Sequence, residues 1–104
     1  MPKHITINTI SKTLAAATPL LLAPAHTQRE FLTIQNTGGT NPMTFKTGSA
    51  PASATDGICL DPATIAGGQG GSYEFRDRVP VDAIYGYSTN GTTVLIFDGS
   101  DAGY

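Results

Sequence analysis

Two runs of aromatic and β-branched residues, within residues 83–97, flank the dipeptide Asn90-Gly91. Asn-Gly accepts the positive φ angles that a type I′ turn needs at both central positions, so the sequence predicts a β-hairpin. Successive side chains alternate across a strand, which places Val94 and Ile96 on one face and Leu95 and Phe97 on the other. Both faces are apolar. The rest of the chain, or a neighbouring copy of it, must therefore cover this strand.

Other short runs along the chain alternate with the period of a strand and are separated by turns rich in Gly, Pro and Asn. These runs predict strands at residues 5–10, 20–22, 29–35, 43–46, 58–60 and 73–76. No segment indicates a stable helix, because Pro19 and Pro24 follow the alanine-rich stretch at residues 15–17 and leave too little length for one. The expected fold is all-β: a single small β-sandwich, jelly-roll-like, or a barrel of about seven to eight short antiparallel strands.

A chain of 104 residues is long enough for one domain and too short for two separate cores. We expect an N-terminal extended arm at residues 1–24, followed by the β-sandwich domain at residues 25–104. The apolar run from Leu14 to Ala25 loosely resembles the core of a cleaved signal peptide. Lys12 lies directly against this run and Pro19 interrupts it, so a structural arm is favoured over a cleaved segment.

Composition argues against several classes of partner. Charged residues make up 13% of the chain, the net charge is -2, and the six basic residues are scattered. A nucleic-acid partner is not expected, since its phosphates require clustered Lys and Arg. No membrane is expected either, because no run approaches the ~18 apolar residues of a spanning helix. The single cysteine, Cys59, excludes an intrachain disulfide.

No pattern in the sequence supports catalysis. Gly86–Asn90 lacks the final glycine of a nucleophile elbow, and Gly67–Gly71 lacks the Lys-Ser/Thr of a phosphate loop. His4 and His26 have no ligand-type neighbours, and Asp98–Asp101 lacks the further ligands of a calcium loop. We expect no enzyme activity, and no catalytic, cofactor-binding or metal-binding residue.

Two pairs of residues are predicted to form interfaces. Ile5 and Ile7 lie on one face of the first strand, which is expected to add to a sheet edge of a neighbouring subunit or of a shell. Tyr85 and Tyr87 share a face of a later strand, as interface or core residues often do. A small glycan-binding β-module that uses the two tyrosines is the alternative for this pair.

A characteristic order of strands and turns runs through Phe31–Asn36, Met43–Lys46, Thr55–Ile58, Val79-Pro80 with Ala83–Tyr87, and Gly91–Val94. This order resembles small β-sandwich virion accessory proteins of tailed bacteriophages. The resemblance implies a structural virion protein of the capsid decoration or cement type, which binds between subunits of the phage's major capsid protein at the capsid surface. It also implies a homo-oligomer, with a trimer favoured. A head-tail junction or tail component is the alternative virion role.

Overall fold

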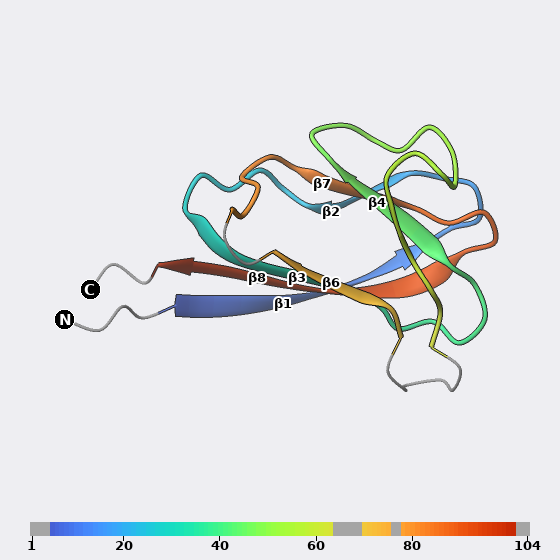
Figure 1. Ribbon diagram of the computed structural model, residues 1–104, viewed down its shortest axis with the longest axis horizontal. Helices are drawn as coiled ribbons and strands as arrows, with labels where there is room; N and C mark the ends of the chain where they lie inside the picture. Colours follow the sequence, from blue (N-terminus) through green and yellow to red (C-terminus); the bar gives the residue numbers. More distant parts are fainter. Residues whose placement is uncertain (1–4, 64–69, 76–77, 102–104) are drawn as a thin grey trace.

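The computed structural model describes residues 5–63, 70–75 and 78–101, and these form two antiparallel four-stranded sheets packed face to face (Figure 1). No helix occurs in the described ranges. The strands are β1 (Ile5–Leu14), β2 (Leu20–Ala23), β3 (Arg29–Asn36), β4 (Met43–Thr47), β5 (Ile58–Leu60), β6 (Ser72–Phe75), β7 (Ile84–Tyr87) and β8 (Thr92–Asp101). The prediction of a small all-β sandwich is confirmed.

The order of the strands is that of a jelly roll. The first sheet runs β1-β8-β3-β6 and the second runs β2-β7-β4-β5. The chain thus pairs its first strand with its last, its second with its seventh, its third with its sixth and its fourth with its fifth. A double-stranded ribbon wrapped around a common core gives this pattern.

The core lies between the two sheets and takes one face of each strand. On β3, Leu32 and Ile34 are fully buried, as the alternation of this run predicts. Phe45 of β4 reaches them from the second sheet, and its ring makes edge contacts with Tyr73 and Phe75, with centroids 6.0 and 6.2 Å away. The strands on the two sides are therefore joined by aromatic as well as aliphatic packing.

The predicted hairpin at Asn90-Gly91 is wrong, although its two strands exist. β7 pairs with β2 and β4 in the second sheet, whereas β8 pairs with β1 and β3 in the first, so the turn connects the two layers. Gly91 has a φ of 90° but Asn90 has no positive φ, which excludes a type I′ turn. Side chains hold this bend: the Ser88 hydroxyl accepts from the Gly91 N–H at 3.1 Å and donates to the Pro42 carbonyl at 2.7 Å.

The alternation expected for β8 is confirmed. Val94 and Ile96 are fully buried between the sheets, and Leu95 and Phe97 lie half-buried on the outer face of the first sheet. β8 is covered along both edges because it pairs with β1 and β3. β8, which has apolar side chains on both faces, thus lies in the interior of its sheet.

The expectation of a separate N-terminal arm is corrected for residues 5–24. β1 pairs with β8 through all ten of its residues, and β2 forms an edge of the second sheet. Leu14 and Leu22 are both buried in the core, and Leu20 and Leu21 are exposed on the edge strand. The segment belongs to the sandwich because its apolar side chains complete the core and its backbone completes the β8 ladder.

A pair of matched substitutions on β1 tests this integration. Ile10 packs against the core and Ile7 is 49% exposed. We expect Ile10→Ala to lower the free energy of unfolding by about 1–2 kcal/mol, roughly half the cost at a fully buried site. Ile7→Ala should change it by less than about 0.5 kcal/mol. Urea unfolding of both variants measures this, and equal effects would contradict a β1 that packs in the sandwich.

Candidate functional site

The predicted interface residues lie on opposite sides of the sandwich. Ile7 pairs with Gly99 of β8, which places it on the outer face of the first sheet. Tyr85 and Tyr87 are half-buried on the outer face of the second sheet, beside the exposed Leu21. The side chain of Ile5 lies outside the described residues, although its backbone begins β1. One flat surface cannot contain both pairs, so they define two separate candidate contact regions.

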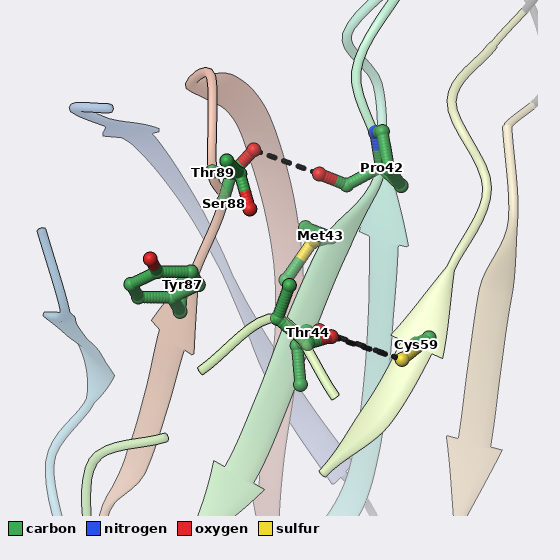
Figure 2. Close-up of a pocket in the computed structure, with 8 residues that line it drawn as sticks. Pro42, Met43, Thr44, Cys59, Tyr87, Ser88 and Thr89 are labelled. Carbon is green, nitrogen blue, oxygen red and sulfur yellow. Dashed lines mark hydrogen bonds between the residues drawn. The ribbon is translucent and has the colours of Figure 1, made fainter. Parts of the chain in front are cut away.

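A small pocket opens beside Tyr87 on the second sheet (Figure 2). Its lining residues come from β4, β5, the end of β7 and the nearby loops: Pro42, Met43, Thr44, Ala54, Cys59, Tyr87, Ser88 and Thr89. Its volume is about 170 Å³, below the roughly 300 Å³ from which small-molecule sites usually start. The pocket has room for a side chain of a partner or a few waters.

Polar groups of Thr44, Ala54 and Cys59 in this pocket bond to one another. The Thr44 hydroxyl donates to the Ala54 carbonyl and lies 3.5 Å from the Cys59 sulfur. The Cys59 thiol, which is exposed, donates to the same carbonyl at 3.4 Å. No histidine lines the pocket, so Cys59 has no base beside it and the nucleophile pair of a cysteine enzyme is not formed here.

The loop from Gly48 to Gly57 is held over the second sheet by an ion pair at its base. Asp56 accepts a hydrogen bond from the Ala52 N–H at 2.9 Å and pairs with the Lys46 ammonium at 3.1 Å. The Ala52 hydrogen bond, and after it the contact with Lys46, lowers the pKa of Asp56 below its ordinary value of 3.8. This carboxylate thus fixes the loop that supplies Ala54 to the pocket.

Titration of Asp56 tests whether its contacts with Ala52 and Lys46 fix this loop. Because folding lowers its pKa, the carboxylate contributes stability at neutral pH, above its unfolded pKa, and loses it as the pH falls through the folded pKa. Carboxyl NMR should show Asp56 titrating below 3.8. Lys46→Met should raise the pKa of Asp56 only part of the way to its ordinary value, since the Ala52 hydrogen bond remains. The matched Lys12→Met should leave it unchanged, and a wild-type Asp56 that titrates at its ordinary value would refute the contact.

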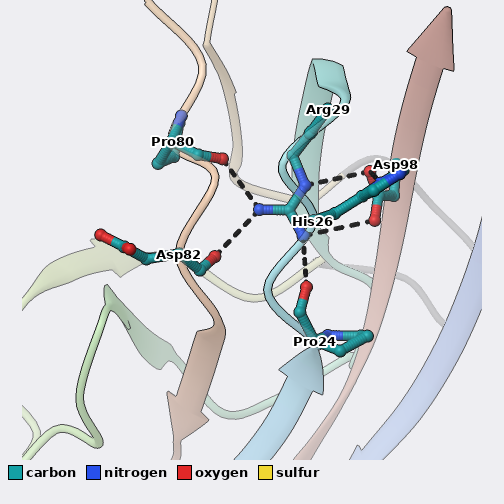
Figure 3. Close-up of polar contacts among 6 residues, drawn as sticks. All are labelled: Pro24, His26, Arg29, Pro80, Asp82 and Asp98. Carbon is teal, nitrogen blue, oxygen red and sulfur yellow. Dashed lines mark hydrogen bonds and ion pairs between the residues drawn. The ribbon is translucent and has the colours of Figure 1, made fainter.

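A buried ion pair lies at one end of the sandwich (Figure 3). Arg29, at the start of β3, has a fully buried side chain, and its Nε donates to Asp98 of β8 at 3.0 Å. The guanidinium also donates to the backbone carbonyls of Pro24, Pro80 and Asp82 at 2.7–3.0 Å. His26 lies at the rim, with its Nδ1 3.7 Å from the Asp98 carboxylate. Asp98 belongs to the first sheet, and Pro24, Pro80 and Asp82 lie in the segments that adjoin β2 and β7 of the second sheet, so this cluster joins the two layers.

This cluster was not predicted from the sequence. The two charged residues are separated by 69 positions, and each looks ordinary in its own segment. The available signal was an arginine and an aspartate directly adjoining apolar strand runs, where a charge is buried only if it is paired.

Removing the carboxylate should unfold the protein more readily. Asp98→Ala leaves a buried guanidinium without its counter-charge, and we expect it to lower the free energy of unfolding by about 3–5 kcal/mol. Asp82→Ala is the matched control, because only the Asp82 backbone carbonyl takes part. That control should stay within about 0.5 kcal/mol of wild type. Chemical denaturation followed by circular dichroism measures both, and a stable Asp98→Ala variant would show that the pair is dispensable.

Metal chemistry finds no support in the part of the chain that the structure describes. No group of three or more His, Cys, Asp or Glu side chains lies close enough to hold an ion among those residues. His26 lies beside Asp98 in the ion-pair cluster, and His4 lies outside the described residues. Among the described residues, no helix is long and apolar enough to cross a membrane.

Comparison with known proteins gives a likeness of fold. No protein-family model matches the sequence, and no curated protein matches it. The structure is similar to a solved protein of Bacillus endospore appendages, which form a family of disulfide-linked pili. The match covers 97% of this chain and 91% of that chain, with a TM-score of 0.51 and 15% sequence identity. At this identity the likeness shows a shared β-sandwich fold and no more.

Proposed function

We propose that this protein is a structural subunit of a larger particle and, more specifically, a decoration protein that binds between the subunits of a phage capsid. The observation that carries the proposal is the presence of large apolar side chains on the outer face of the second sheet, Leu21, Tyr85 and Tyr87. Leu21 is exposed and the two tyrosines are half-buried, and apolar surface gathered on one face is typical of surfaces that bind other proteins. The Thr44 and Cys59 side chains of the neighbouring pocket are hydrogen-bonded within the chain, so this face offers a partner mainly apolar contact area.

Three further features support a structural role. The domain is small and needs no disulfide, as suits a part made in many copies. Its low charged fraction of 13% gives weak repulsion between copies packed side by side. Double-sheet jelly rolls occur in viral capsid and lectin domains, which is an analogy at the level of fold. The trimer is proposed for the protein bound to the capsid, where a local three-fold axis of the shell sets the number of copies at each site.

Binding to empty phage heads that lack their accessory proteins tests the proposal. We expect the protein to co-sediment with such heads, and the double variant Y85S/Y87S to bind at least about tenfold more weakly, a loss of ~1.4 kcal/mol. Tyr73→Ser is the matched control: Tyr73, on β6 of the first sheet, is 40% exposed and makes edge contacts with Phe45 and Phe75, so its loss should lower the melting temperature but not the affinity for heads. Failure of the wild-type protein to bind any head, or unchanged binding by the double variant, would overturn the capsid role.

A filament subunit is the second candidate, favoured by the likeness of fold to the pilus protein. The chain's one cysteine, Cys59, allows at most one disulfide to another copy. Covalent linkage would then stop at pairs, so a filament of this protein would be held by non-covalent contacts. Filaments that appear in electron micrographs of the purified protein, and that persist in reducing agent, would favour this candidate over the capsid role.

A further inference from the structure

The four strands at the edges of the sheets differ greatly in length. β1 and β6 are the edges of the first sheet, and β2 and β5 are the edges of the second. β1 has ten residues, whereas β2 and β6 have four each and β5 has three. An edge strand presents a row of unpaired N–H and C=O groups, so β1 exposes far more of them than any other edge in the described ranges.

β1 also has few of the devices that commonly protect an edge. β2 is bounded by Pro19 and Pro24 and has an irregular register, and β5 is followed directly by Asp61-Pro62. β1 pairs with β8 without a bulge, contains no proline, and carries Lys12 as its one charged residue. Proline, bulges and charges are the usual means of blocking edge-to-edge pairing, and β1 makes little use of them.

We infer that β1 binds β1 of a second copy of this chain, antiparallel, about a two-fold axis that runs perpendicular to the first sheet near Thr9. Such pairing continues the four-stranded sheet into one of eight strands and satisfies the free backbone groups of both edges. A free edge of ten residues is fully paired only by another free edge of that length. Among the described strands only β8 is as long as β1, and β8 is already paired on both sides. The matching free edge is therefore β1 of a second copy.

The side chains of β1 are compatible with this two-fold pairing. With Thr9 opposite Thr9 of the second copy, outer-facing residues meet outer-facing residues, because every second position shares a face. Ile7 then lies opposite Ser11, and Lys12 opposite Thr6, so that the two lysines are not opposed. Thr9 and Ser11 are exposed in the single chain, and threonine pairs across strands are favourable. No like charges or bulky groups oppose one another along the shared edge.

Light scattering across a range of protein concentrations, from micromolar to millimolar, tests the inference. We expect the wild-type mass to rise towards twice the 10.8 kDa of one chain. T9K opposes two ammonium groups at the two-fold axis and should raise the dissociation constant by at least about tenfold. S49K adds the same charge at an exposed position in the loop over the second sheet, and its dissociation constant should match wild type.

A crosslinking experiment gives a second, independent readout. Directly opposed residues of antiparallel strands have Cα atoms about 4.5–5.5 Å apart, within the range that a disulfide spans. In a Cys59→Ser background, T9C should therefore form a covalent dimer on mild oxidation, and S49C should not. A monomer at every concentration, a T9K variant that dimerises like wild type, or a T9C variant that stays uncrosslinked would each overturn the inference.

The edge contact and the proposed capsid role can fail independently. The capsid role rests on Tyr85 and Tyr87 of the second sheet, whereas the pairing rests on β1 of the first. We expect Y85S/Y87S to retain the wild-type dissociation constant of the dimer. A Y85S/Y87S protein that no longer dimerises would show that copies associate through the second sheet, and would contradict the β1 contact.

Discussion

The buried pair of Arg29 and Asp98 closes one end of the sandwich, and the placement of two other segments depends on it. An arginine has five N–H groups in a fixed planar fork, and each must find an acceptor once water is excluded. The Asp98 carboxylate takes two of these bonds, and the carbonyls of Pro24, Pro80 and Asp82 take the other three (Figure 3). The end of β2 and the approach to β7 are thereby fixed against the first sheet.

A second polar cluster closes the opposite end, and it starts from the other end of the same strand. Asn36, the last residue of β3, is fully buried and donates to the carbonyls of Asn41 and Leu60 at 2.9 and 3.2 Å. Its own side-chain oxygen accepts from the Thr92 hydroxyl and the Gly38 N–H. β3 therefore carries an apolar middle between two polar ends, each of which connects the two sheets. Within each cluster the polar groups bond to one another. The outer faces and the edges of the sheets are then the surfaces left for binding a partner.

The sequence predicted the strands well because their signal is local. Alternation of side chains in runs such as residues 29–35 and 43–46 depends on neighbouring residues alone, and it identified both strands. It also identified the buried face of residues 29–35, whereas in β4 Thr44 is buried beside Met43 and Phe45. The connection at Asn90-Gly91 failed for the opposite reason. Its local chemistry favours a hairpin, but Ser88 bonds to Pro42 and Asn41 bonds to Gly91 across the fold. Such contacts between distant positions leave no periodic trace in the sequence.

The same contrast between local signals and distant contacts explains which parts of the candidate site were predicted. Alternation correctly placed Tyr85 and Tyr87 on a shared face of β7. The sequence predicted that the first strand would add to a sheet edge of a neighbour, but not that β1 is itself a free edge paired with β8. Whether a strand is an edge depends on the order of strands in the sheet, and a local run does not encode that order. The Arg29 cluster was missed because its partners lie 5–69 positions away along the chain.

The free edge of β1 and the outer face of the second sheet are suited to different kinds of contact. A two-fold pairing through β1 is isologous, so both copies use the same edge, and the contact closes at two chains. The remaining edges are short, and two of them adjoin prolines, so they resist further growth by strand addition. The apolar face of the second sheet lies on the other layer of the sandwich and stays open in such a pair. A paired unit would thus present two copies of the Tyr85 and Tyr87 face to a larger particle, and two linked weak contacts bind more tightly than one.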